Sequence, residues 1–111
     1  EFFQGQEKAR PLFEAVVCAV ANLSGVEMRV TKSQVAFRRR IAFAWVWIPA
    51  HHLRRPAAPL VLTIGLRFHH PSPRWKQVVE PYPGRFTHHL ELNDPAEVDG
   101  EVYSWLRQAW L

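Results

Sequence analysis

The chain has 111 residues, of which 48% are hydrophobic, with five Trp, seven Phe and a single Cys. This composition excludes a disordered chain, and one cysteine excludes both an internal disulfide and a cysteine-based zinc site. The net charge of +4 is unevenly spread, because residues 26–85 carry eleven basic side chains against two acidic ones, whereas the segments before and after are net acidic. A basic segment of this size suggests an anionic partner.

The first predicted element is a helix over residues 8–23. At 100° per residue its apolar side chains fall on one face. These side chains are Ala9, Leu12, Phe13, Val16, Val20 and Leu23. Proline is tolerated only in the first turn of a helix, so Pro11 places the start near residues 8–11. Ser24 and Gly25 form a suitable end.

Alternating apolar and polar residues predict the strands that follow. The strand segments are 26–31, 34–39, 42–48, 60–68 and 85–92. The strand 42–48 is apolar on both faces, which predicts a central strand with other elements packed on each side. We therefore assign Trp45, Trp47, Trp105 and Trp110 to the core. A ligand pocket between sheet and helices, where Trp faces stack on a flat ligand, is the alternative.

The connections between these strands carry further expectations. Residues 39–41 are predicted to form the tip of a hairpin. Gly65, inside the segment 60–68, marks a bulge or a close backbone approach. The Pro-rich segment 69–83 is predicted to be irregular, with a short ordered piece at residues 75–79.

A start signal and an apolar stripe predict a closing helix. Asp94, Pro95 and Glu97 match the N-cap, the first position and the third position of a helix. The stripe consists of Val98, Val102, Trp105, Leu106, Ala109 and Trp110. The chain thus runs helix, four or five strands, helix. Short connections favour antiparallel pairing, because parallel neighbours need crossovers of about a dozen residues or more.

The order of these elements predicts the fold class. We expect a single α+β domain over residues 1–111, with a mainly antiparallel four- to five-stranded sheet. The N-terminal and C-terminal helices are expected to cover one face of that sheet, in two layers.

Several short motifs resemble one bacterial family. The motifs are residues 31–40 (TKSQVAFRRR), 43–47 (FAWVW), 85–92 (RFxHHxEL) and 98–106 (VDxEVxxWL). Over essentially its whole length the chain is similar to the family known as domain of unknown function 5655. The resemblance implies a compact α+β domain, found alone or fused to other domains. It implies no activity, so no functional residue is carried over from it.

A basic surface is the candidate functional site. Guanidinium forks suit phosphate oxygens, and Trp75 between Arg74 and Lys76 is an interleaving typical of single-stranded nucleic-acid binding. The predicted ligand-binding residues are Lys32, Arg38, Arg39, Arg40, Arg67, Arg74 and Lys76. The alternative interpretation is that these side chains are solvated or pair with the acidic helices.

Neither a metal site nor a catalytic site is predicted. Each of the histidine pairs 51–52, 69–70 and 88–89 offers at most one ligand to a site, since neighbours on a strand point to opposite faces. His88 is expected to be half-buried with a hydrogen-bond partner. Cys18 lies opposite the apolar stripe of the first helix, with no local support for a lowered thiol pKa.

The leading functional prediction is a non-catalytic module that binds an anionic partner, either a nucleic acid or a nucleotide, without a cofactor. The first alternative is an accessory domain whose basic face meets an acidic protein, and the second is an enzyme of unknown reaction. We expect a cytoplasmic protein with no membrane partner. No apolar run reaches the roughly 18 residues of a membrane span, and no signal peptide is visible.

Overall fold

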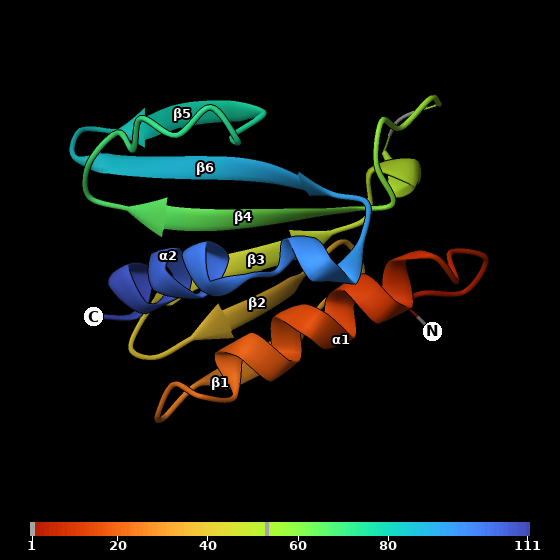
Figure 1. Ribbon diagram of the computed structural model, residues 1–111, viewed down its shortest axis with the longest axis horizontal. Helices are drawn as coiled ribbons and strands as arrows, with labels where there is room; N and C mark the ends of the chain where they lie inside the picture. Colours follow the sequence, from red (N-terminus) through yellow and green to blue (C-terminus); the bar gives the residue numbers. More distant parts are fainter. Residues whose placement is uncertain (1, 53) are drawn as a thin grey trace.

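The computed structural model describes residues 2–52 and 54–111 (Figure 1). This part of the chain forms α1 (Ala9–Val20), β1 (Glu27–Val30), β2 (Val35–Arg38), β3 (Ala42–Trp47), η1 (Pro49–His51), β4 (Leu60–Leu66), β5 (Gln77–Tyr82), β6 (Arg85–Leu92), η2 (Pro95–Glu97) and α2 (Gly100–Trp110), where η marks a 3-10 helix. The predicted α+β architecture, with helices at both ends of an antiparallel sheet, is confirmed.

The strands form one sheet in the order β1-β2-β3-β4-β6-β5, and every neighbouring pair is antiparallel. The sheet has six strands, more than predicted, because the Pro-rich segment contributes β5. β5 lies at an edge, where Pro81 is tolerated because one side of the strand needs no hydrogen-bonding partner. The pairing of β5 with β6 shifts in register between Val79 and Tyr82, on either side of this proline.

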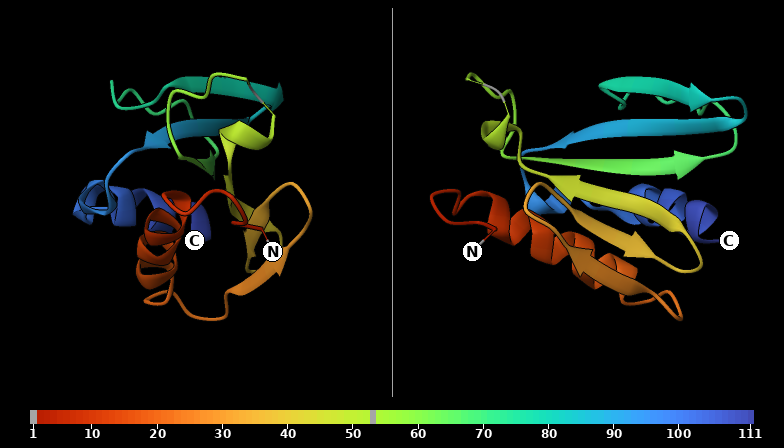
Figure 2. Two further views of the ribbon diagram at one scale, coloured as in Figure 1. Left: turned by 90° about the vertical axis from the view of Figure 1, so that its right-hand side faces the viewer. Right: turned by 180° about the vertical axis from the view of Figure 1, so that it is seen from behind.

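Both helices lie on one face of the sheet (Figure 1, Figure 2). α1 buries the predicted stripe of Ala9, Leu12, Val16 and Val20, and α2 buries Val102, Trp105 and Leu106. The sheet contributes Ala44, Val46, Leu60, Leu62, Ile64, Leu90 and Leu92 to the same core. Burying one large aliphatic side chain stabilises a fold by about 1.5–3 kcal/mol. The interface between the two layers is therefore the main hydrophobic core.

Among the described residues, no helix covers the other face of the sheet, and this corrects the prediction for β3. Ala44 and Val46 face the helices and are fully buried. The two-residue period of a strand therefore places Trp45 and Trp47 on the outer face, where they are partly buried and lie outside the core cluster. The apolar outer side of β3 is thus a partly exposed aromatic surface, and Trp45 does not share a core with the buried Trp105.

α1 begins at Ala9, within the predicted range of 8–11, but the end of α1 and the start of α2 differ from the prediction. α1 ends at Val20, although Leu23 beyond it remains buried. The capping box of Asp94 and Glu97 is present, but it opens η2. α2 starts later, where the carboxylate of Asp99 accepts a hydrogen bond from the Val102 amide at 3.0 Å. No helix in the described part of the chain is both long enough and apolar enough to cross a bilayer.

Candidate functional site

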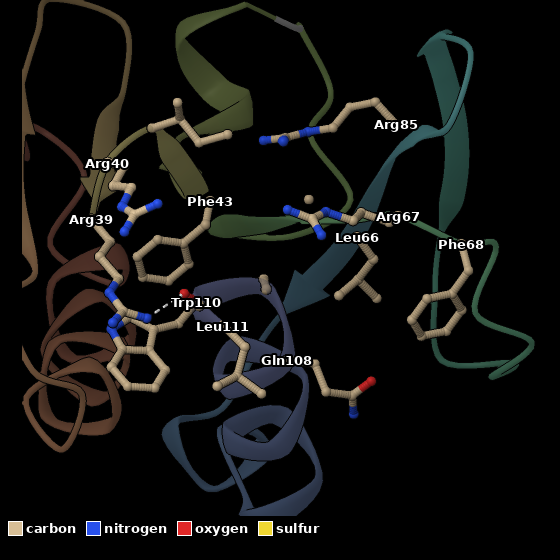
Figure 3. Close-up of a pocket in the computed structure, with 13 residues that line it drawn as sticks. Arg39, Arg40, Phe43, Leu66, Arg67, Phe68, Arg85, Gln108, Trp110 and Leu111 are labelled. Atoms are coloured by element: carbon tan, nitrogen blue, oxygen red, sulfur yellow. Dashed lines mark hydrogen bonds between the residues drawn. The ribbon is translucent and has the colours of Figure 1, made fainter.

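A pocket of about 580 Å³ lies at one end of the sheet (Figure 3). The β2–β3 hairpin, the end of β4, the start of β6 and the last turn of α2 meet there. Its lining residues are Arg39, Arg40, Ile41, Phe43, Gly65, Leu66, Arg67, Phe68, Arg85, Gln108, Ala109, Trp110 and Leu111. The described lining thus combines four arginines with an apolar wall and contains no acidic residue. Its volume is within the roughly 300–1,000 Å³ range of small-ligand sites.

The β2–β3 hairpin supplies two of the arginines, Arg39 and Arg40. The predicted tip over residues 39–41 is confirmed, since Arg38 pairs with Ala42 and the Arg39 amide donates to the Ile41 carbonyl at 3.2 Å. The register of the β2–β3 pair shifts at the end of β2. Irregularities of this kind bend a strand and redirect its side chains. Here the tip faces the last turn of α2 (Figure 3).

Arg39 is held against the end of α2. Its guanidinium lies 4.1 Å from the centre of the Trp110 ring, and its Nη1 donates to the Trp110 carbonyl at 3.2 Å. The carbonyls at a helix C-terminus lack partners within the helix and carry partial negative charge, so an arginine is favourable there. Arg39 therefore has a structural role, and the same contacts fix one positive charge at the rim of the pocket.

Arg85 is positioned by Gly65 of β4. The Arg85 Nη2 donates to the carbonyl of Ala42 on β3 at 2.8 Å, so this side chain spans β4. A Cβ atom on Gly65 would lie 3.1 Å from that Nη2. The pairs that Gly65 makes show no register shift, so the residue does not mark a bulge. The close approach there is made by an arginine side chain.

The positive charge of the pocket is not neutralised within the described residues. The ion pairs found there involve Arg74 and Lys76, and none of the four pocket arginines takes part in one. Figure 3 shows Arg67 and Arg85 extending toward the side of the pocket that carries Arg39 and Arg40. Several guanidinium groups around one concavity make a local positive potential that attracts anions.

The predicted ligand-binding residues fall into three places. Arg39, Arg40 and Arg67 come together in the pocket. Arg38 lies beside it at the end of β2, and Lys32 is exposed in the β1–β2 turn, at the opposite end of the same strand.

Arg74 and Lys76 are engaged elsewhere, in ion pairs. The Arg74 Nη1 lies 2.8 Å from Glu101 and 3.1 Å from Asp99, and its Nη2 donates to the Glu97 carbonyl at 2.9 Å. The hydrogen bond to Glu101 raises the pKa of Arg74. The Lys76 ammonium lies 3.2 Å from a Glu91 carboxylate oxygen. Arg74 therefore ties its loop to the start of α2, as in the alternative of pairing with the acidic helices, whereas Lys76 pairs with an acidic residue of β6.

Sequence reasoning left Arg85 out of the predicted ligand-binding residues, and it assigned Trp110 to the core with a ligand pocket as the alternative. It did not consider Phe68 for the site. Phe68 was predicted to continue the buried face of a strand, but β4 ends at Leu66 and Phe68 is 46% exposed at the pocket. Gly65 was a signal that something approaches β4 closely. The identity of that group depends on the pairing of β4 with β6, which places Gly65 opposite Thr87.

Two members of the predicted histidine pairs, His70 and His88, make hydrogen bonds within the fold. His88 is fully buried, where its Nε2 accepts from the His70 amide at 2.9 Å and its Nδ1 lies 3.2 Å from the Phe86 carbonyl. His88 was expected to be only half-buried. Its surroundings assign the proton to Nδ1, and burial lowers its pKa. The His70 ring accepts from Trp105 Nε1 at 3.1 Å. No cluster of three or more potential metal ligands occurs among the described residues.

Comparison with known proteins agrees with the resemblance seen in the motifs. The family model described as Domain of unknown function (DUF5655) matches residues 1–111. No curated protein and no solved structure matches the chain.

Proposed function

The chain belongs to the DUF5655 family, which is defined without an activity, and we propose that it is a non-catalytic module that binds a phosphate-bearing ligand, a nucleotide or a nucleic acid, at the pocket. The observation that carries this proposal is the set of four arginines around one concavity, without an acidic residue in the described lining. Guanidinium groups bind phosphate oxygens through paired N–H donors. A phosphate group would supply the charge that the pocket lacks.

Two of the arginines are already oriented. Arg39 and Arg85 each donate a hydrogen bond from one guanidinium nitrogen to a backbone carbonyl. Their other N–H donors remain available to a ligand. Arg40 and Arg67 bring further donors from two different elements. Fixed donors lose less conformational entropy when a ligand binds.

The remaining lining favours an organic ligand and binding without catalysis. Phe43, Leu66, Phe68 and Trp110 form an apolar wall beside the arginines, which suits a base or a sugar attached to the phosphate. The described lining contains no His, Cys, Ser, Lys, Asp or Glu. It therefore offers no nucleophile and no general acid or base, because arginine does not give up its proton.

The proposal is tested with a fluorescein-labelled single-stranded oligonucleotide, whose binding is followed by anisotropy as a function of salt. The double variant Arg40→Gln/Arg67→Gln removes two charges from the pocket. We expect it to weaken binding at least about tenfold, since hydrogen bonds to charged groups contribute about 1.5–3 kcal/mol each. The slope of log K against log salt should flatten by about 1.4, or 0.7 for each lost contact.

The matched control is Arg54→Gln/Arg55→Gln, which removes the same charge from an exposed loop outside the pocket. We expect this variant to bind within about twofold of the parent and to keep most of its salt slope. Competition by inorganic pyrophosphate separates a nucleotide-sized anion site from a polymer surface. Equal losses in the two double variants, or no binding by the parent at about 50 mM salt, would contradict the proposal. A protein partner, the alternative from the sequence, has no comparable support in this concave, aromatic-walled site.

A further inference from the structure

The outer face of the sheet, opposite the helices, carries an aromatic surface. In the view from behind, the strands lie in front of both helices (Figure 2). Trp45 and Trp47 project from this face of β3, two residues apart on one strand and hence about 6.6 Å apart along it. Both are partly exposed, and neither belongs to the core. Two partly exposed tryptophans on a face that no described helix covers are a candidate interaction surface.

Two small residues flank Trp45 on the outer face. Its cross-strand partners are Ala36 on β2 and Thr63 on β4. Ala36 is 7% exposed and Thr63 is 5% exposed, although no described helix covers them. The large side chains of the face must shield these neighbours, and Trp45 lies between them.

Trp47 is fixed in place by hydrogen bonds. Its Nε1 donates to the Thr63 hydroxyl at 3.1 Å, and that hydroxyl lies 2.8 Å from Nδ1 of His89 on β6. The His89 ring lies edge-on to the Trp47 ring, with the ring centres 6.3 Å apart. Burial lowers the pKa of His89. This network orders the aromatic surface before any ligand arrives.

Positive charge borders the two tryptophans. Arg29 and Arg38 belong to the same face, because they pair across the strands with Ala36 and Glu27 respectively. Arg85 also crosses this face, over Gly65, and lines the pocket. Among the described residues, strand pairing places the acidic side chains of Glu27 and Glu91 on this face, and Glu91 is paired with Lys76. The aromatic surface is therefore continuous with the arginine pocket through Arg85.

We propose that the outer face binds single-stranded nucleic acid, with bases stacked on Trp45 and Trp47 and the backbone held by Arg38 and Arg85. This inference rests on the proposed function, because the pocket supplies the phosphate anchor. Stacking on aromatic side chains beside a basic groove is how proteins bind single strands without sequence preference. A duplex does not fit this surface as well, because its base faces are hidden in the stack. A second copy of this chain is disfavoured, because it would bring like charges together.

Two probes that carry equal numbers of phosphates test the proposal. One is oligothymidylate of about 12 nucleotides, within the site sizes of single-strand binding modules. The other is an abasic deoxyribose-phosphate oligomer of the same length. We expect the parent to bind the thymidylate about five- to a hundredfold more tightly, since only that probe can stack. Equal affinity for both probes would overturn the stacking proposal but would still support phosphate binding at the pocket. If neither probe binds, both the stacking proposal and the proposed function are wrong.

Substitutions then locate the stacking. Trp45→Leu should lower affinity for the thymidylate at least about fivefold and leave affinity for the abasic oligomer unchanged. The matched control is Tyr82→Leu, which removes an aromatic side chain that is 61% exposed at the β5 edge, and it should change neither affinity. If Trp45→Leu binds the thymidylate like the parent, the proposal is wrong. The comparison of the two probes on the parent decides the matter even if that variant fails to fold. Sedimentation can show whether the free parent is a dimer. A dimer that the thymidylate cannot dissociate would assign the outer face to self-association, and this result would also overturn the proposal.

Discussion

The guanidinium of Arg85 lies directly over Gly65. The Nη2 atom would be 3.1 Å from a Cβ atom at that position, and it reaches past β4 to donate to the Ala42 carbonyl of β3 at 2.8 Å. One missing side chain near the end of β4 thus allows one charged group to lie between the arginine pocket and the outer face of the sheet.

Gly65→Ala should weaken anion binding with little effect on stability. The new methyl group must shift the Arg85 guanidinium by a few tenths of an ångström, because 3.1 Å is tighter than an ordinary contact. Replacing glycine in a strand stabilises by roughly 0.5–1 kcal/mol, which offsets the weakening of the hydrogen bond to Ala42. We therefore expect a free energy of unfolding within about 1 kcal/mol of the parent and a severalfold loss of oligonucleotide affinity. In an Arg85→Gln background the same substitution should cause no further loss of affinity, and an additive loss would contradict the link between the two residues.

Trp105→Ala should destabilise the fold strongly. The Trp105 ring is 2% exposed, its centre lies 4.2 Å from that of Trp75, and its Nε1 donates to His70. Truncating a buried tryptophan costs about 3–5 kcal/mol, and here a histidine acceptor also loses its donor. Urea unfolding measures the change. Trp45→Ala is the comparison, and its cost should be clearly smaller because Trp45 lies outside the core. Equal costs would contradict this placement of the two rings.

The fold class could be predicted from periodicity, because the large apolar side chains of α1 and β4 repeat with the period of a helix and of a strand. Leu60, Leu62 and Ile64 alternate toward the helices as their spacing predicts, and Leu12 and Val16 fall on the buried face of α1. The outer face of β3 could not be assigned in the same way. The two-residue period of a strand shows that Trp45 and Ala44 point to opposite faces of the sheet. Whether another layer covers Trp45 depends on which face both helices pack against.

The candidate site was only partly predictable, because charge composition does not determine charge pairing. Arg67 and Arg74 look alike in the sequence, yet one lines the pocket and the other is bound to Asp99 and Glu101. Those acids lie at the start of α2, so the pairing depends on how the 69–76 loop packs there. The role of Arg85 depends on strand order, since β6 is inserted between β4 and β5.

Acid should destabilise the protein through His88 and His89, whose pKa values are lowered by burial. Burial lowers the pKa of His88 below the value of about 6.5 expected in the unfolded chain, and the nearby His69 and His70 lower it further. Above that pH, His88 is neutral in both the folded and the unfolded chain, so it contributes nothing to the pH dependence of stability. As pH falls through about 6.5, the unfolded chain takes up a proton that the folded chain does not, so stability decreases, by at most about 1.4 kcal/mol per pH unit for one proton.

Urea unfolding at pH 7.5, 6.5 and 5.5 measures this dependence. His88→Gln keeps an acceptor for the His70 amide and cannot titrate, so its stability should fall less between neutral and acid pH than that of the parent. His89 contributes with the same sign, since burial lowers its pKa as well. The control His51→Gln replaces an exposed histidine and should keep the parent profile. A parent whose stability is flat over this range would refute the assignment.

Arg74→Gln should separate total charge from charge at the site. It removes one positive charge, as Arg67→Gln does, but Arg74 contacts Asp99, Glu101 and the Glu97 carbonyl, whereas Arg67 lines the pocket. Partly exposed ion pairs contribute about 0–1 kcal/mol, so we expect a small loss of stability at the start of α2. Oligonucleotide affinity should stay within about twofold of the parent, whereas Arg67→Gln should lower it severalfold. If both variants lose affinity equally, net charge governs binding. The pocket would then not be the binding site.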